Sequence, residues 1–346
     1  MPIKLFFYGR PPKDIKLTNY EYCDGNPKSL DYDSNQKFST YRKVLRRIFA
    51  SIRFYKLLKN SIDKDINTKL LFVDYEYLSL TIFLFFYLRK NPKYIVLHSV
   101  NENELGFKNI YKNFFYIVMD RIPNVSYIVN GEYSGELLSQ RTTKDITIIQ
   151  YPTSLDHVRI PKLLAKSRLS LDGVTVISMI GMIRRDKNYH QAISSFSRSK
   201  MANNPSFVLL IAGYPSNITA NEIIELLKKL GVTNYILKPE YLSDISLHTY
   251  YCASDFLLAP YGSKGSSQSG PVSQARLYDL PVITLSGGEI GSYVDREMVG
   301  ITFKTFDELS YIFDELLSYT SSYDFDSVKE KFSWEKAAEK YLNILQ

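Results

Sequence analysis

Short apolar runs alternate with segments of helical periodicity along most of the chain. In the first half, the runs predict strands at residues 3–8, 69–73, 94–97, 126–129 and 146–149. Between them the pattern predicts helices at residues 38–58, 77–88 and 104–120. Apolar runs of this length between helices are typical of parallel strands that are covered on both faces. The first half is therefore predicted to be an α/β domain.

The alternation stops at residues 150–168, which contain Pro152 and Pro161 and have no clear period. It then restarts with predicted strands at residues 174–180, 207–212, 235–237, 256–259 and 281–285. The second half also has predicted helices at residues 189–199, 221–230, 244–252, 271–278, 306–318 and 334–345. The linker and the restart indicate a second domain of the same α/β class.

The two arrays predict an α/β fold with two Rossmann-like, doubly wound parallel-sheet domains that face each other across a cleft. We expect an N-terminal domain at residues 1–155, a C-terminal domain at residues 170–330, and a closing helix at residues 331–346 that returns to the N-terminal domain. Ligands of such folds bind beyond the carboxyl ends of the strands. The functional residues are expected at those ends.

Composition narrows the class of protein. Cys23 and Cys252 lie far apart and near no histidine cluster, so neither a zinc site nor a disulfide is predicted. The longest apolar run, Tyr77–Leu88, is too short to cross a bilayer, which needs about 20 residues, and is predicted to be a buried core helix. No signal-peptide pattern begins the chain. A cytoplasmic protein is expected.

Several common active-site motifs are absent from the sequence. It has no GxGxxG after the first strand, no GxxxxGK[ST], no GxSxG and no HExxH. The four histidines show no metal-ligand spacing. These absences remove the main support for a dehydrogenase, an ATPase, an esterase or a zinc hydrolase.

Positive charge is concentrated in the first half. Residues 1–155 contain 23 Lys and Arg against 15 Asp and Glu, whereas the remainder contains 20 against 21. Residues 34–62 contain eight basic residues and no acid, and the predicted helix at 38–58 within them is amphipathic. Its arginines form a candidate patch for an anionic membrane surface, the inner face of the plasma membrane; they are Arg42, Arg46, Arg47 and Arg53. The alternative is an ordinary domain helix with its cations in water; nucleic acid ranks lower, because no nucleic-acid motif accompanies the patch.

Two loops of the second half are candidate phosphate sites. The first follows the predicted strand 174–180, and its candidate residues are Gly181, Arg184, Arg185 and Lys187. A small residue permits close approach of a ligand, and the cations can neutralise a diphosphate. The second follows strand 256–259 and is rich in hydroxyl and backbone N–H donors; its candidates are Tyr261, Ser266, Ser267, Gln268, Ser269 and Gly270. The alternatives are a solvated basic turn and a flexible surface loop.

The second half resembles the retaining GT-B glycosyltransferases of family 4, also called group 1. Five stretches match that family's motifs in order: Gly181–Lys187 with the helix HQAISSF, LLIAGYP at 209–215, the block ending ASDFLLAPY at 253–261, ARLYDLPVITLSGG at 275–288, and FSWEKAAEKYLNIL at 332–345. The resemblance implies that the C-terminal domain binds a nucleotide sugar and that Lys187 contacts the donor diphosphate. Met182 stands where the family usually has an arginine.

The resemblance fails at the family's E-x7-E pair. Alignment on LPVI places Ser266 and Gln274 at the two glutamate positions. Gln274 can still form a hydrogen bond with a ribose hydroxyl, but Ser266 cannot act as a carboxylate would. The stereochemical outcome therefore stays open, as does a non-catalytic homologue.

The first half resembles the family only in outline. The resemblance places Gly9 and Arg10 at a turn facing the cleft, and His98 at a strand end beside the donor sugar or the acceptor. A histidine there can take a proton near neutral pH. Asp74 is the other candidate base, for an inverting reaction. The alternatives are a structural histidine and a helix-capping aspartate.

Together these observations predict a metal-independent hexosyltransferase without a cofactor. The expected donor is a UDP- or GDP-sugar, and the expected acceptor is a polyprenyl-linked oligosaccharide in surface polysaccharide biosynthesis, such as that of a capsule or O-antigen. No nucleic-acid partner is expected. Two alternatives remain: a non-catalytic homologue that supports a partner transferase, and a nucleotide-sugar epimerase.

Overall fold

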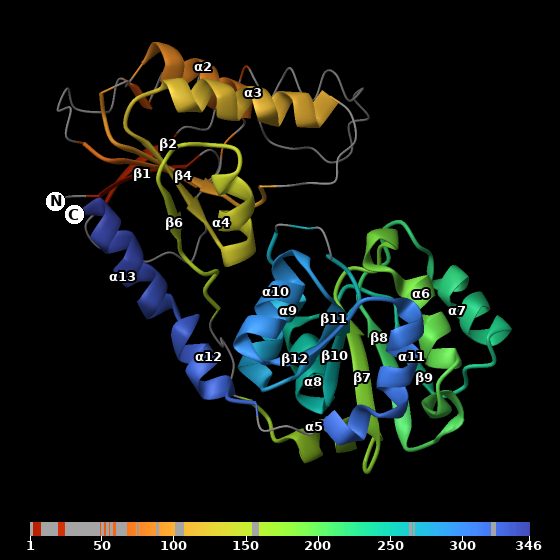
Figure 1. The fold of residues 1–346 in the computed structure, drawn as a ribbon. Helices are drawn as coiled ribbons and strands as arrows, with labels where there is room; N and C mark the ends of the chain where they lie inside the picture. The colour runs from red at the N-terminus through yellow and green to blue at the C-terminus, as the bar shows by residue number, and fades with distance from the viewer. Residues whose placement is uncertain are drawn as a thin grey trace. The chain divides into compact units, whose positions relative to one another are not determined.

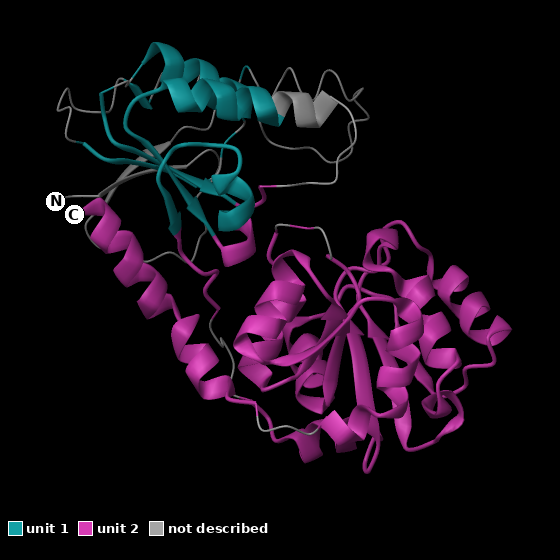
Figure 2. Ribbon diagram, viewed as in Figure 1, with its two compact units in different colours: residues 1–97, 104–129, 135–147 teal, residues 98–103, 130–134, 148–346 magenta. Residues whose placement is uncertain are grey.

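The computed structural model describes residues 3–7, 20–24, 49, 52, 55, 58–59, 68–73, 75, 77–87, 90–100, 107–153, 159–262, 265, 267–319 and 323–346. The chain divides into two compact units, coloured separately in Figure 2. Unit 1 comprises residues 1–97, 104–129 and 135–147, and unit 2 comprises residues 98–103, 130–134 and 148–346. Each unit has its own parallel β-sheet, which confirms the predicted α/β class.

Unit 1 contains a four-stranded sheet in the order β3-β4-β5-β6. Its strands are β3 (Leu70–Phe72), β4 (Lys93–Leu97), β5 (Val125–Val129) and β6 (Ile146–Ile148). Its helices are α2 (Tyr77–Phe86) and α3 (Phe107–Arg121). Helix α4 (Glu132–Ser139) is shared, because its first three residues belong to unit 2 and the rest to unit 1. A separate parallel pair joins β1 (Ile3–Phe7) to β2 (Tyr20–Asp24), a strand that the apolar pattern did not predict.

Helix α2 is less buried than the sequence indicated. Its polar side chains Ser79 and Thr81 are buried, whereas Phe85 and Phe86 are 42% and 68% exposed. The prediction of a buried core helix at Tyr77–Leu88 is therefore wrong for Phe85 and Phe86, although Leu80, Phe83 and Leu84 are buried. The hydrophobic periodicity did not predict which side is exposed, because apolar residues lie on every face of this helix. Among the described residues, no helix is long and apolar enough to cross a membrane.

Unit 2 contains a six-stranded parallel sheet in the order β12-β11-β10-β7-β8-β9. Its strands are β7 (Thr175–Ile180), β8 (Phe207–Ala212), β9 (Tyr235–Lys238), β10 (Phe256–Ala259), β11 (Val282–Leu285) and β12 (Gly300–Phe303). Five of the six match predicted strands. The order reverses at β7, which lies between β8 and β10, so a topological switch point lies beyond the carboxyl ends of β7 and β10.

Helices cover both faces of this sheet, as Figure 1 shows. The helices of unit 2 are α5 (Lys162–Arg168), α6 (Tyr189–Ser197), α7 (Ala220–Lys229), α8 (Asp244–Ala253), α9 (Gly270–Ala275), α10 (Gly288–Glu297), α11 (Phe306–Asp314), α12 (Phe325–Lys331) and α13 (Trp334–Leu345). Strand β7 serves both cores: Val176 and Ile180 belong to one apolar cluster, and Ile177 and Met179 to the other. Burial on both faces explains why apolar residues stand at both odd and even positions of this strand.

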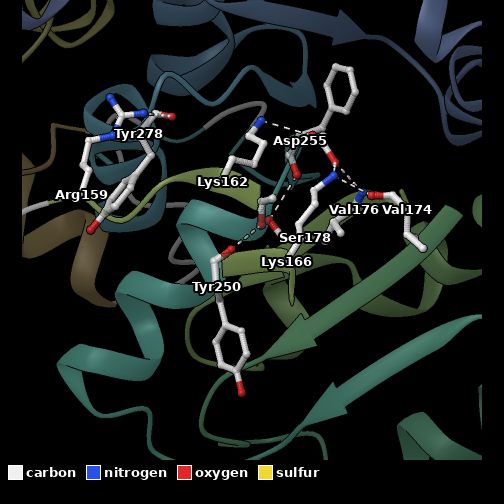
Figure 3. A network of polar contacts seen from close by, with 11 residues as sticks. Arg159, Lys162, Lys166, Val174, Val176, Ser178, Tyr250, Asp255 and Tyr278 are labelled. Atoms are coloured by element: carbon white, nitrogen blue, oxygen red, sulfur yellow. Dashed lines mark hydrogen bonds and ion pairs between the residues drawn. The ribbon is translucent and has the colours of Figure 1, made fainter. Parts of the chain in front are cut away.

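A polar network ties the start of this sheet to the helix before it (Figure 3). The carboxylate of Asp255, just before β10, accepts hydrogen bonds from Lys166 Nζ at 2.6 Å, Lys162 Nζ at 3.2 Å and the Val176 amide at 2.8 Å. Ser178 Oγ donates to Phe256 O at 3.2 Å. The aspartate of the ASD stretch therefore joins β7, β10 and α5 at the amino ends of the strands, opposite the end where ligands of such sheets bind.

Candidate functional site

A tight turn follows β7 at the switch point. Gly181 has a φ of +114°, and a Cβ there would lie 3.0 Å from Pro271 Cγ and 3.3 Å from Lys187 Nζ. The chain then forms a short 3-10 helix, η1 (Arg185–Lys187), and Asn188 enters α6 with a φ of 55°. Asn188 Nδ2 donates to Pro260 O at 2.7 Å, which fixes this turn to the end of β10. A glycine is needed at 181 both for its conformation and for its close neighbours.

A second glycine supports the same turn. Gly213, after β8, has a φ of +149°, and a Cβ there would lie 2.0 Å from Gly181 O. Gly181 N donates to Ala212 O at 2.9 Å. The backbones of the two turns are therefore in direct contact. The sequence shows Gly213 only as the end of an apolar run.

Lys187 is the most unusual charged residue of this region. Its side chain is buried, with 8% exposure, and its Nζ lies 5.0 Å from the centroid of the Tyr261 ring. Burial, with a further contribution from nearby Arg184, lowers the pKa of Lys187 to about 8. Among the described residues, no carboxylate lies within ion-pair distance of this ammonium. A buried cation without a counter-ion is a receptor for an anion.

The two arginines of the turn already have partners. Arg184 pairs with Asp186 at 2.8 Å, while its guanidinium still contributes to the lowered pKa of Lys187. Arg185 pairs with Glu222 of α7 at 2.8 Å, and its amide donates to Asn217 Oδ1 at 2.8 Å. Arg184 is therefore the better placed of the two to meet an anion beside Lys187.

The loop after β10 meets the turn after β7 through Tyr261 and Ser269. Tyr261 Oη and Ser269 Oγ are 2.9 Å apart, and Ser269 Oγ accepts from the Val272 amide at 3.4 Å to cap α9. Burial raises the pKa of Tyr261 to about 12, so its hydroxyl stays protonated at neutral pH. The structure thus brings together Gly181, Lys187, Tyr261 and Ser269, four of the predicted donor-site residues.

The other predicted residues of this loop are placed differently. Gln268 Nε2 donates to Asn130 O at 3.1 Å, within unit 2, and Ser267 and Gly270 are exposed. Gln274 is half-buried on α9. Ser266 lies outside the described residues.

Glu289 is a carboxylate that the sequence interpretation missed. It is buried at the first turn of α10, where its amide donates to Gly265 O at 2.8 Å. Its carboxylate accepts hydrogen bonds from the amide and hydroxyl of Ser134, another unit 2 residue, at 2.9 Å and 2.7 Å. Burial raises the pKa of Glu289. The GG-E spacing of the sequence is the signal that could have singled it out.

The predicted residues of the first half are only partly described. His98 follows β4 and is exposed. Asp74, Gly9, Arg10 and the basic patch Arg42, Arg46, Arg47 and Arg53 lie outside the described residues, so their roles stay predictions. The part of the chain that is described contains no group of three or more His, Cys, Asp or Glu that could hold a metal ion.

Residues 162–324 match the model of the family "Glycosyl transferases group 1". This part of the chain is therefore similar to the group 1 glycosyltransferases. The matched residues include the predicted donor-site residues Gly181, Lys187, Tyr261 and Ser269, and also Glu289. No curated protein matches the chain at a significant level.

Solved structures show that the chain has a GT-B fold. A sucrose-phosphate synthase from Thermosynechococcus elongatus superposes with a TM-score of 0.69 and 16% identity, covering 99% of this chain and 88% of that one. A glycosyltransferase from Rickettsia africae gives 0.65 and 14%, covering 94% and 84%. HepE of Anabaena, in complex with UDP and glucose, gives 0.64 and 14%, covering 90% and 84%. The predicted fold, two Rossmann-like domains of the GT-B type, is confirmed.

Proposed function

We propose that the protein transfers a hexosyl group from a UDP- or GDP-sugar to a polyprenyl-linked glycan acceptor. The observation that carries this proposal is Lys187, a buried ammonium to which the described residues offer no carboxylate partner, at the switch point of the part that matches the group 1 family model. The complex of HepE with UDP and glucose supports a uridine nucleotide as the first donor to test. A role in surface polysaccharide assembly at the cytoplasmic face of a membrane belongs to the same proposal.

In this reaction the site must stabilise a leaving group. The bond between the sugar C1 and the diphosphate oxygen breaks, and negative charge grows on the diphosphate. Lys187 and Arg184 neutralise that charge, and the interaction is strong at Lys187 because its ammonium is buried. The acceptor hydroxyl loses its proton to a base, for which His98 and Asp74 are the candidates. No metal is required in this scheme, because the protein supplies the cations.

A panel of nucleoside diphosphates tests the donor site. We expect one of UDP, GDP, CDP, ADP and dTDP to raise the thermal unfolding midpoint of the wild-type protein, and Lys187→Ala to abolish the shift. The matched control is Lys229→Ala, which removes the same charge from an exposed position on α7. If folded wild-type protein responds to none of the nucleotides, the transferase proposal fails.

One observation favours a second candidate, a non-catalytic homologue. Ser266 and Gln274 occupy the positions of the family's two glutamates, so neither carboxylate is present. Such a protein would bind a nucleotide sugar and transfer nothing. Product analysis of donor incubated with and without acceptor separates this candidate from the transferase, and also from an epimerase, which would convert the donor without any acceptor.

A further inference from the structure

The outward side of helix α2 is apolar, although this side faces solvent. Its polar side chains, Ser79 and Thr81, are 1% and 3% exposed, and Thr81 Oγ1 donates to Tyr77 O at 2.6 Å. By contrast Ile82 is 40%, Phe85 42% and Phe86 68% exposed. The helix has no charged residue. Its arrangement is the reverse of a helix that covers a sheet in water, which keeps its polar residues outside.

Helix α3 continues the same surface. Phe115 and Met119 are buried, whereas Phe114 and Ile117 are 50% and 53% exposed. Figure 1 shows α2 and α3 side by side in unit 1, and the rings of Tyr77 and Phe115 meet with centroids 4.9 Å apart. We call the outward side of these two helices the α2–α3 face; its apolar residues are Ile82, Phe85, Phe86, Phe114 and Ile117.

A few described helical residues before α2 add apolar and basic groups to this region; they are residues 49, 52, 55, 58 and 59. Tyr55 stacks on Phe83 of α2 with centroids 4.7 Å apart, while Phe49 is 64% exposed. Lys59 Nζ lies 4.2 Å above the ring of Tyr87, directly after α2. Exposed cations also follow the ends of the helices, at Lys90 and Arg121.

Negative charge is nearly absent from these elements. Asp120 is the one acidic residue in the sequences of α2 and α3, and its carboxylate accepts a hydrogen bond from Thr142. Exposed phenyl groups bordered by cations are what an interfacial membrane contact needs: the apolar groups enter the boundary of headgroups and acyl chains, and the cations meet anionic headgroups. A second copy of the chain would bring like charges together instead.

We infer that the α2–α3 face docks on an anionic lipid surface, with the side chains of Phe85, Phe86, Phe114, Ile82 and Ile117 in the interface. The inference deepens the membrane association of the proposed function, since it names the contact surface. It does not depend on the donor site. It also differs from the basic patch predicted from the sequence at Arg42, Arg46, Arg47 and Arg53, because the affinity here comes from apolar insertion as well as from charge.

Vesicle sedimentation with the full chain tests the inference. We expect the wild-type protein to sediment with vesicles of phosphatidylcholine and phosphatidylglycerol, and weakly with phosphatidylcholine alone. The double variant Phe86→Glu/Phe114→Glu should bind the mixed vesicles at least about tenfold more weakly, because it removes two inserted phenyl groups and adds negative charge. The control is Tyr311→Glu, an equally exposed aromatic on α11 of unit 2, which should bind as the wild type does.

Three results would overturn the inference. The first is a double variant that binds the mixed vesicles as tightly as the wild type does. The second is a wild-type protein that does not bind anionic vesicles. The third is a wild-type dimer that the double variant turns into a monomer, which assigns the face to a second copy. The nucleotide-induced thermal shift is measured on the same variants. Its survival in the double variant separates loss of docking from loss of the donor site or of the fold.

Discussion

Lys187 is held charged at neutral pH in a place that does not favour charge. Burial disfavours its ammonium, Arg184 repels it, and the face of the Tyr261 ring compensates only in part. The buried charge destabilises the free protein, and its interactions become favourable when a diphosphate binds. The lysine could be predicted from its motif, but its burial and its lack of a carboxylate partner could not, because both depend on segments distant in sequence.

Nucleotide binding should therefore take up protons. With a pKa of about 8 in the free protein, Lys187 is charged below pH 8 and loses its proton above it. A bound diphosphate raises that pKa, so affinity should be constant below pH 8 and fall by up to about tenfold per pH unit above it. Titration calorimetry at pH 8, in buffers of different ionisation enthalpy, should show uptake of about half a proton. Lys187→Arg should remove the uptake; a wild-type reaction without it would argue against the contact.

The same lysine predicts a gain in stability upon its replacement. Its pKa is lowered from 10.5 to about 8 on folding, so the unfolded chain binds more protons between these values and the free energy of unfolding rises with pH across that window. Lys187→Met, which keeps the volume and removes the charge, should stabilise the free protein by about 1–3 kcal/mol at pH 7. Urea unfolding checks this. A clear destabilisation would mean that the ammonium has a structural role.

At the scale of elements, the parallel strands were the part of the fold most open to prediction. Four strands of unit 2, β7, β8, β10 and β11, are covered on both faces, so each is a mostly apolar run that the hydrophobic pattern predicts. Strand β12 escaped detection because it is short and half-exposed. Helix α2 was detected but its burial was wrong, since an apolar run does not reveal whether another element covers it.

Contacts between turns were beyond the reach of sequence patterns. Gly213 has to be glycine because Gly181 O occupies the space of its Cβ, a relation between two strand ends. Arg276 is similar: it is 2% exposed and donates to Tyr151 O at 2.7 Å and to Thr153 Oγ1 at 2.9 Å. Its sequence context looks like that of a surface residue, and only the tertiary structure supplies the partners that allow its burial.

Gly213→Ala should destabilise unit 2 by about 2–4 kcal/mol, because the added methyl group overlaps Gly181 O and the φ of +149° is unfavourable for alanine. Gly231→Ala is the matched comparison: its φ is +67° but nothing lies within 4 Å of its Cβ, so about 1 kcal/mol is expected. The single tryptophan, Trp334 of α13, lies in unit 2 and can report urea unfolding by fluorescence. Equal losses for both variants would refute the proposed contact.

At the scale of the whole molecule, the two units divide the proposed tasks. Unit 2 contains the residues that match the group 1 family model, and its strand order creates the switch point where Lys187 lies. Unit 1 carries the α2–α3 face, within the half of the sequence that has a net charge of +8 from 23 basic and 15 acidic residues. The charge asymmetry could be read from the sequence, but the apolar face could not.

The most direct test of the account is transfer itself. Labelled nucleotide sugar, chosen by the nucleotide that stabilises the protein, is incubated with polyprenyl-linked oligosaccharides and the full chain, and label in the organic-extractable product is counted. We predict protein-dependent transfer that falls by about 100-fold in Lys187→Ala and persists in Lys229→Ala. Tight nucleotide-sugar binding without transfer to any acceptor in such a panel would contradict the account and identify the protein as a non-catalytic homologue.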